Sequence, residues 1–579
     1  MKKKIIRRQL PASAIAFPET VHPLLQRIYS TRGIGSVQDL ERGLENLLPY
    51  AGLKDIDKAV ALLTRVLQQQ GKMLIVGDFD ADGATSTAVA VRALRSFGAQ
   101  QIDFLVPNRF AFGYGLTPEL VEVAKEMKPA LIITVDNGIA NHAGVAAAKA
   151  AGMAVLITDH HLPAPTLPEA DAIVNPNQLE DSFPGKNLAG VGVIFYVMLA
   201  LRRHLTGLDW FNQQGLAAPN MAALLDIVAL GTVADLVPLD RNNRVLVHQG
   251  LRRIRSKLCA PGILALLEVA NREPQRITAS DLGYAVAPKL NAAGRMDDMS
   301  LGINCLITDD PAQARQLAQS LNRLNEERRV IEQDMHESAL ETLALWQRKD
   351  QSQLPMGICL FNPAWHQGVI GILASRIKER IHRPVIVFAP SSEGELKGSA
   401  RSISTVHIRD VLAKIATASP TLIKRFGGHA MAAGLTIDAK DYDLFSQRFD
   451  EVLREQLREE DLQQLVHSDG ELAEEDLNLK MAELLEEAGP WGQAFPEPIF
   501  DDTFRVLEQR LVANKHLKMT LAKGQRHLDA VAFNIDQAQW PNYRCEQIYA
   551  AYRLDVNEYR NKRTVQLIVE HLEPAGGAN

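Results

Sequence analysis

The stretch Met73-Leu-Ile-Val-Gly-Asp-Phe-Asp-Ala-Asp-Gly83 joins a short apolar run to three carboxylates at alternate positions. Two later apolar runs have the same design. Leu131–Val135 is followed by Asp136-Asn-Gly138, and Val155–Thr158 is followed by Asp159-His-His161. Helical segments separate the runs, and continuous apolar strands that alternate with helices predict a parallel sheet covered on both faces. The expected fold class is therefore α/β.

The carboxyl ends of the three predicted strands all carry acidic or histidine residues, and ligands of open parallel sheets bind beyond these ends. Hard oxygen ligands with one imidazole suit Mg²⁺ or Mn²⁺ better than zinc or copper. More than three carboxylates in one pocket cannot all stay ionised without compensating cations. We therefore expect two divalent ions about 3.5–4 Å apart, with one carboxylate bridging them. The side chains expected to converge there are Asp80, Asp82, Asp136, His160 and Asp235.

Two alternatives compete for the acidic residues. Asp78–Gly83 matches the first six positions of an EF-hand calcium loop, but the twelfth position is Val89 instead of Glu, and the segment follows a strand. Alternatively, each Asp only caps the helix after its strand. Capping explains a single Asp better than it explains four such positions together with Asp159-His-His161. The pattern favours a two-metal centre, which activates water and clamps both oxygens of an in-line phosphoryl displacement.

Composition limits the class of protein. Of the 579 residues, 46% are hydrophobic and 23% charged, which is typical of a folded protein and excludes a disordered, collagen-like or disulfide-stapled chain. Lys and Arg number 63 against 69 Asp and Glu, so a nucleic acid would need a local basic patch. The four scattered cysteines contain no Cys-x-x-Cys pair, which argues against a zinc knuckle and fits a reducing cytosol.

No segment predicts a membrane span. The charged start Met1–Arg8 lacks the apolar core of a signal peptide, because prolines and a glutamate interrupt the residues that follow. The longest apolar run, Leu188–Leu201, is too short to cross a bilayer. We expect a cytoplasmic protein without a membrane partner.

The chain is expected to divide into five segments. Asp309-Asp-Pro311 is a helix start, and apolar spacings of three and four extend this helix over about 55 Å, to about Arg348. Such a helix connects domains, with a coiled-coil partner site as the alternative. The segments are an N-terminal arm over 1–45, the sheet domain over 46–305, a connecting helix over 306–350, a second α/β domain over 351–450, and an acidic helical segment plus a small β-rich domain over 451–575.

The strand-end motifs together resemble those of the DHH phosphoesterases, whose second domain is called DHHA1. The resemblance covers about residues 50 to 570, and a longer block narrows it to bacterial exonucleases that degrade single-stranded DNA from 5′ to 3′. The motifs that carry it are Gly77–Gly83, Val135-Asp-Asn137, Asp159-His-His161, Thr232-Val-Ala-Asp235, Ala287–Asp297, Leu321–Asn325 and, for DHHA1, Phe426-Gly-Gly-His-Ala-Met-Ala-Ala-Gly434.

The resemblance implies metal-binding roles position by position. Asp80 is similar to a ligand of the first metal, and Asp136 to the bridge. The ligands implied for the second metal are Asp82, His160 and Asp235. Asp78 and Asp159 are implied to stand behind the ligands, and His161 to contact the scissile phosphate. The pyrophosphatase branch of the family has a His where this chain has Val76, which leaves Asp78 or water to complete the first shell.

The resemblance also implies a grip on the DNA strand. The residues implied to bind phosphate near the 5′ end are Arg109, Arg295, Ser399, Arg401, Gly427, Gly428 and His429. Glycine stretches are more often turns than anion sites, and turns remain the alternative here. Trp365 either stacks on a base or packs inside its loop. The C-terminal region resembles an oligonucleotide/oligosaccharide-binding (OB) barrel. Its best candidates for phosphate contact are Lys515, Lys518, Arg560, Lys562 and Arg563, while at least half of its aromatics are expected to be barrel core.

The resemblance implies an exonuclease that hydrolyses single-stranded DNA to mononucleotides with Mg²⁺ or Mn²⁺, in DNA repair and recombination. It implies single-strand-binding protein and a RecQ-type helicase as partners. One alternative is another DHH-type phosphoesterase acting on short RNA, cyclic dinucleotides or pyrophosphate, although such chains are generally shorter and lack the C-terminal domain. A catalytically inactive DNA-binding scaffold is the other, although scaffolds lose the metal ligands that this chain keeps.

Overall fold

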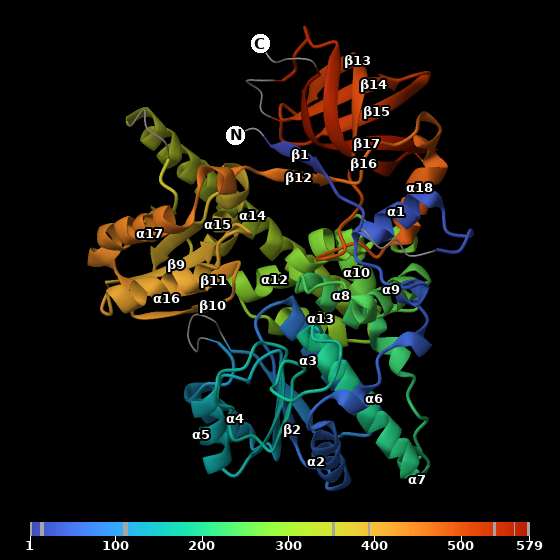
Figure 1. Cartoon of the computed structure of the whole chain (residues 1–579). Coiled ribbons are helices and arrows are strands. Elements are labelled where there is room, and N and C mark those ends of the chain that lie inside the picture. The colour runs from blue at the N-terminus through green and yellow to red at the C-terminus, as the bar shows by residue number, and fades with distance from the viewer. Residues whose placement is uncertain are drawn as a thin grey trace. The chain divides into compact units, whose positions relative to one another are not determined.

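The computed structural model describes residues 3–11, 17–107, 114–349, 354–391, 394–535, 540–560 and 562–575 (Figure 1). The chain forms two compact units. Unit 1 comprises Met1–Ile6 and Glu326–His467, and unit 2 comprises Arg7–Asn325 and Ser468–Asn579. The predicted long helix is present as α14 (Pro311–Lys349), and the division falls inside it instead of at its ends.

Unit 2 contains a five-stranded sheet of order β3-β2-β4-β5-β6 in which every pairing is parallel. Its strands are β2 (Met73–Val76), β3 (Ile102–Leu105), β4 (Leu131–Val135), β5 (Ala154–Thr158) and β6 (Ala172–Val174). Alternate residues of β2 enter different cores. Met73 and Ile75 join the core of α2, α3 and α6, whereas Leu74 and Val76 join that of α4 and α5. The prediction of a parallel sheet covered on both faces is confirmed.

The helices that cover this sheet follow the strands along the chain. On one side lie α2 (Ile56–Gln68), α3 (Ala81–Ser96) and α6 (Gly190–Gly207), and on the other lie α4 (Pro118–Met127) and α5 (His142–Ala150). The remaining helices of this part are α1 (Pro23–Thr31), α7 (Trp210–Gln213), α8 (Leu225–Ala234), α9 (Arg241–Arg255), α10 (Pro261–Val269), α11 (Ala279–Asp281), the π-helix η6 (Leu282–Val286), α12 (Ala287–Met296) and α13 (Ser300–Ile307).

Unit 1 contains the second α/β domain, a five-stranded mixed sheet of order β10-β11-β9-β8-β7. Its elements are β7 (Ile358–Phe361), α15 (Ile370–Ile381), β8 (Val385–Pro390), β9 (Glu395–Arg401), α16 (Ile408–Ala418), β10 (Arg425–Gly428), β11 (Ala432–Asp438) and α17 (Tyr442–Gln456). Leu457 and Leu462 pack into the core of this sheet, so the unit extends past the boundary expected at residue 450.

The C-terminal part of unit 2 is a closed five-stranded barrel of order β13-β14-β15-β17-β16, in red in Figure 1. Its strands are β13 (Phe500–Val512), β14 (His516–Lys523), β15 (Arg526–Ala532), β16 (Gln547–Tyr559) and β17 (Lys562–Pro574). Phe504, Trp540 and Tyr552 are buried, whereas Phe533 and Tyr543 are exposed. The predicted OB-like barrel is confirmed.

The segment between the second α/β domain and the barrel is only partly helical. It contains the end of α17, the strand β12 (Leu465–Ser468), which pairs with β1 (Lys4–Arg7), and α18 (Leu479–Ala488). Most acidic residues of this segment therefore lie at exposed or half-buried positions of several short elements. Throughout the described ranges, no helix has both the length and the apolar character needed to cross a membrane.

Candidate metal centre and nucleic-acid interface

The loop after β2 carries three of the predicted carboxylates. Asp80 is the N-cap of α3, and its Oδ1 accepts a hydrogen bond from the Gly83 N–H at 3.0 Å. The carboxylate of Asp82 accepts from the N–H groups of Gly190 (2.6 Å) and Val191 (3.0 Å), in the first turn of α6. The N-terminus of a helix favours an anion, so Asp82 is held in one orientation.

Asp136 follows β4 in a strained backbone conformation, with φ of +62°. Such conformations in residues other than glycine collect at functional sites. Gly190 lies directly against it, because a Cβ at that position would come within 2.6 Å of the Asp136 Cβ. The Tyr114 hydroxyl also donates to the Asp136 carbonyl at 3.1 Å. The position of Asp136 is therefore fixed from several sides.

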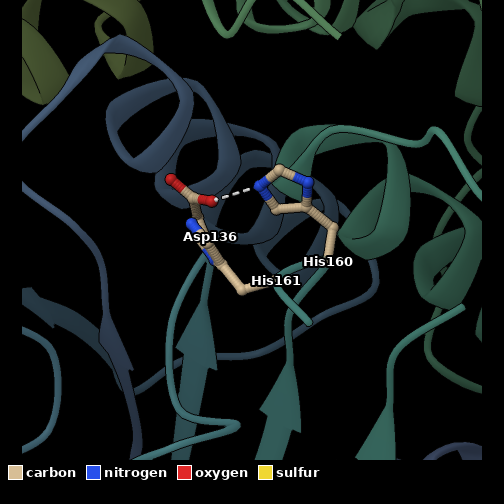
Figure 2. A group of neighbouring side chains, drawn as sticks. All are labelled: Asp136, His160 and His161. Atoms are coloured by element: carbon tan, nitrogen blue, oxygen red, sulfur yellow. Dashed lines mark ion pairs between the residues drawn. The ribbon is translucent and has the colours of Figure 1, made fainter. Parts of the chain in front are cut away.

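His160 follows β5 and is the histidine that meets the carboxylates. Figure 2 shows its ring turned toward Asp136, with 3.1 Å between His160 Nε2 and Asp136 Oδ1. The same nitrogen lies 3.5 Å from Asp235 Oδ2 and 3.9 Å from Asp82 Oδ2. Asp235 is the residue at the C-terminal end of α8. The predicted convergence of strand ends and α8 is thus present.

Three overlapping groups of side chains offer ligand atoms that all lie within 4.8 Å of one another. They are Asp82, His160 and Asp235; Asp78, Asp80 and Asp136; and Asp136, His160 and His161. The first group is the set expected for the second metal. The second group places Asp78 beside Asp80, as a direct ligand would be, and Asp136 belongs to two of the groups, as a bridging residue would.

The electrostatics of the cluster favour bound cations. Burial and the nearby Asp80 raise the pKa of Asp82 to about 7. Burial followed by the neighbouring carboxylates also raises the pKa values of Asp136 and Asp235 well above the usual range. Like charges that are buried together disfavour ionisation unless a counter-charge is present. A donor set of carboxylates and one imidazole, crowded in this way, fits two Mg²⁺ or Mn²⁺ ions.

Asp159 and His161 form a separate pair at the same edge. Burial would raise the pKa of Asp159, but its hydrogen bond with His161 (2.7 Å) lowers the value below the usual range. Burial would lower the pKa of His161, but Asp159 raises it to about 9. Asp159 also accepts from the backbone N–H groups of His160 and Ile139. It therefore orients the strand end and favours the charged form of His161.

Comparison with known proteins identifies the family to which the chain is related. It matches the DHH family, N-terminal domain over residues 72–232, the DHHA1 domain over 355–455 and the RecJ OB domain over 468–571. It is 54% identical to the single-stranded-DNA-specific exonuclease RecJ of Dickeya dadantii, over 98% of this chain and 99% of the relative. The chain belongs to the RecJ family. It is also 51% identical to the Escherichia coli exonuclease of the same name, over 99% of this chain and all of the relative.

Solved structures of the RecJ family extend the likeness to the fold. RecJ from Thermus thermophilus in complex with Mn²⁺ is 29% identical and has a TM-score of 0.78, over 96% of this chain and 76% of that one. The complex of the same protein with Mg²⁺ is 27% identical and has a TM-score of 0.72, over 96% and 75%. The metals in these structures agree with the donor set at the sheet edge.

In the RecJ-family DHHA1 domain, the predicted phosphate residues lie on three neighbouring strands. Ser399 on β9 pairs with Gly434 on β11, which pairs with Gly427 on β10. A Cβ at Gly427 or Gly434 would meet no atom within 4 Å, so packing does not require glycine there. Gly428 has φ of +142° and a crowded Cβ position, so the turn alternative holds for Gly428. His429, which begins the turn, is exposed.

Arg401 and Ser399 form the polar centre of this surface. The Arg401 guanidinium donates to Ser399 Oγ at 3.1 Å, and burial lowers its pKa from the usual value. Within the described ranges, no carboxylate forms an ion pair with Arg401. Gly371, in the first turn of α15, lies next to both side chains, because its Cβ would be 3.0 Å from each. A helix N-terminus beside a buried arginine can bind a phosphate.

The basic candidates of the RecJ-family barrel do not form one patch. Lys515 follows the β13–β14 turn, whereas Arg560 lies in the β16–β17 turn, and strand directions place these turns at opposite ends of the barrel. Lys518 and Lys562 instead line one hollow of about 390 Å³. Its other lining residues are Asp529, Asn557, Thr564 and Gln566. Arg563 forms an ion pair with Glu483.

Sequence reasoning missed some residues and misread others. Asn291 accepts from the Ala81 N–H at 2.8 Å and so supports the metal loop, a role that its motif alone does not predict. Nothing in the sequence distinguished Gly371 or Gly190. Trp365 is only 6% exposed, which supports the packed-loop alternative. Arg295 is half-buried near the end of α12, and Arg109 lies outside the described residues.

Proposed function

We propose that this protein is a metal-dependent exonuclease that hydrolyses the phosphodiester bonds of single-stranded DNA. The observation that carries the proposal is the convergence of five carboxylates and His160 at one edge of the sheet. Membership of the RecJ family supports the substrate, since its relatives are named as exonucleases specific for single-stranded DNA. Two bound divalent ions supply an activated water and stabilise the charge that develops on the phosphate.

The residues of the chain orient this chemistry. Asp82 stays fixed by two backbone N–H groups of α6, and Asp136 by its strained backbone and by Gly190. We assign direct metal binding to Asp78, Asp80, Asp82, Asp136, His160 and Asp235. His161, held in its charged form by Asp159, contributes a positive donor for a phosphate oxygen beside the cluster.

Polarity from 5′ to 3′ and release of mononucleotides are also part of the proposal. The surface of Ser399, Arg401 and Gly371 can bind a terminal phosphate, and Gly427 and Gly434 carry no side chain that would block a ligand from that face of the sheet. In the barrel, the hollow with Lys518 and Lys562 can bind the backbone of the strand. We further propose single-strand-binding protein and a RecQ-type helicase as partners in DNA repair and recombination, in the cytoplasm.

The test uses single-stranded DNA labelled separately at each end, with Mg²⁺, Mn²⁺ or a chelator. We expect immediate release of the 5′ label as mononucleotide and stepwise shortening of the 3′-labelled strand, both lost in chelator. Release of the 3′ label first would contradict the polarity. A shifted band without cleavage in either metal would instead indicate a binding scaffold. Neither cleavage nor binding would redirect the assay to dinucleotides and pyrophosphate.

A further inference from the structure

One face of the helix that supports the metal loop is open to solvent along its length. The exposed or half-buried positions of η6 and α12 include Tyr284, Pro288, Asn291 and Arg295. Their spacings of four, three and four residues place them on one side of the helix. We call these four residues the helix stripe. The intervening residues Lys289, Leu290, Ala292 and Ala293 are buried.

The helix stripe lies beside the metal centre. Asn291 Oδ1 accepts from the N–H of Ala81, which stands between the metal-site residues Asp80 and Asp82. One turn further on, α12 touches the same loop, because a Cβ at Gly294 would clash with the Phe79 carbonyl oxygen. In η6, Gly283 faces Val233 of α8, two residues before Asp235.

The Tyr284 end of the helix stripe leads toward the barrel. Arg276, eight residues before Tyr284, forms an ion pair with Glu558 of β16. Glu558 follows Asn557 in β16, so its side chain lies on the opposite face of the strand from the hollow that Asn557 lines with Lys518 and Lys562. Arg272 also pairs with Asp281, three residues before Tyr284, at 2.8 Å. The stretch around Tyr284 is thus tied on one side to α8 and the metal loop, and on the other to the barrel strand that carries the hollow.

Tyr284 itself is 83% exposed, the largest exposure of any described aromatic residue. Within the described ranges its side chain takes part in no hydrogen bond and no ring contact. It stands on a π-helix, a rare form that is frequent at functional sites. An aromatic ring with a free face offers stacking to any base, which adds to the phosphate contacts that hold the strand.

We propose that Tyr284 is a positioning residue of the exonuclease, on which a base stacks as the single strand approaches the metal centre. This inference rests on the proposed function. Tyr284 lies about 10 Å along the helix axis from Asn291, at 1.5 Å per residue. The stacked base therefore belongs to a nucleotide near the scissile phosphate and not to a distant part of the strand.

The first test is a steady-state comparison of the wild type with Tyr284→Ala and Tyr284→Phe on single-stranded DNA. We expect the alanine variant to raise KM about 5- to 150-fold, the range given by loss of one stacked base, with a much smaller fall in kcat. Tyr284→Phe keeps the ring and should stay within about two-fold of the wild type. Leu258→Ala, which removes an exposed apolar side chain (63%) that belongs neither to the helix stripe nor to the barrel, is the control and should not change KM.

The second test identifies the base. Oligonucleotides with one abasic position, moved stepwise from the 5′ end, should show weaker binding by the wild type at one position, and no such position in Tyr284→Ala. An unchanged KM in Tyr284→Ala, an equal rise in Leu258→Ala, or the same abasic profile in the wild type and Tyr284→Ala would overturn the inference. Failure of the proposed function looks different, since the wild type itself would then neither cleave nor bind the strand.

Discussion

The protein buries two groups of carboxylates and neutralises them in opposite ways. In the barrel, Asp501 is bound by Arg7 (2.6 Å) and by the Tyr549 hydroxyl (2.7 Å). Asp502 is bound by Lys523 and by the Tyr552 hydroxyl. At the sheet edge, no described lysine or arginine forms an ion pair with Asp82, Asp136 or Asp235.

The pKa of Asp501 follows this difference, whereas burial raises the pKa of Asp502 to about 6 despite Lys523. Burial would raise the pKa of Asp501, but Arg7, Ser468 and Tyr549 lower it below the usual range. At the edge, burial and like charges raise the pKa of Asp136 well above that range. Acidic residues that the chain supplies with its own counter-charges are structural. A cluster of several buried acidic residues left without them forms a site for cations that come from outside.

The largest effect is expected when one negative charge is removed from the carboxylate cluster at the sheet edge. Asp136→Asn should lower kcat about 10³-fold or more, because it removes the proposed bridge between two cations, while asparagine tolerates the left-handed backbone. The measurement is release of mononucleotides with Mg²⁺ and Mn²⁺.

Asp226→Asn is the matched control for that experiment. Asp226 is also fully buried with a raised pKa, but it accepts a hydrogen bond from the Ala260 N–H at 2.7 Å, which asparagine can replace. This variant should keep its activity. Cleavage by Asp136→Asn at nearly the wild-type rate would contradict the two-metal assignment.

The sequence predicts the carboxylate cluster at the sheet edge. It does not predict that the barrel carboxylates receive counter-charges from the chain while the edge carboxylates do not. Asp80, Asp136 and His160 follow apolar strand runs, and parallel strands bring their carboxyl ends to one edge, so local pattern alone predicts their convergence. Asp501 and Asp502 form an acidic pair as prominent as Asp80 and Asp82. Arg7, the partner of Asp501, is 494 residues away from it, and no spacing rule links such residues.

The DNA-binding surface was less predictable for a related reason. Lys515 and Lys518 are close in sequence, yet only Lys518 lines the hollow, because alternate strand residues face opposite sides and because the hollow also needs β15, β16 and β17. Likewise Trp365 is buried and Tyr284 exposed, although aromatic type alone favours both as stacking platforms. The exposure of a side chain depends on how the chain packs, which a single sequence does not show.

Metal binding should have a smaller effect, on the stability of the protein. This effect distinguishes the carboxylates at the sheet edge from those in the barrel. Adding Mn²⁺ to chelator-treated protein should stabilise it by about 2.7 kcal/mol at 100 times the Kd, because the ions bind only the folded centre. The rise in Tm checks this. Asp136→Asn should lose most of the rise, whereas Arg7→Ala should keep it from a lower starting Tm. An equal rise in Asp136→Asn would place the stabilising ions elsewhere.

The smallest effect concerns the counter-charge in the barrel. Arg7→Ala should destabilise the protein by about 1–2 kcal/mol at pH 7, less than for a fully buried pair, because the Arg7 side chain is 54% exposed. In the wild type the folded pKa of Asp501 is lowered. Its ionised form therefore stabilises the fold above about pH 4, and this contribution is lost as the pH falls through the folded pKa.

In Arg7→Ala the sign reverses, because burial is then opposed by fewer donors and the Asp501 pKa rises above its unfolded value. The variant regains stability relative to the wild type as the pH falls from 7 toward 4, so the difference in unfolding free energy should shrink over that range. Denaturant unfolding at both pH values measures it. Lys58→Ala, which breaks an exposed pair with Asp55, is the control and should show no pH-dependent difference. A difference that stays constant for Arg7→Ala would mean that Asp501 does not depend on Arg7 for its charge.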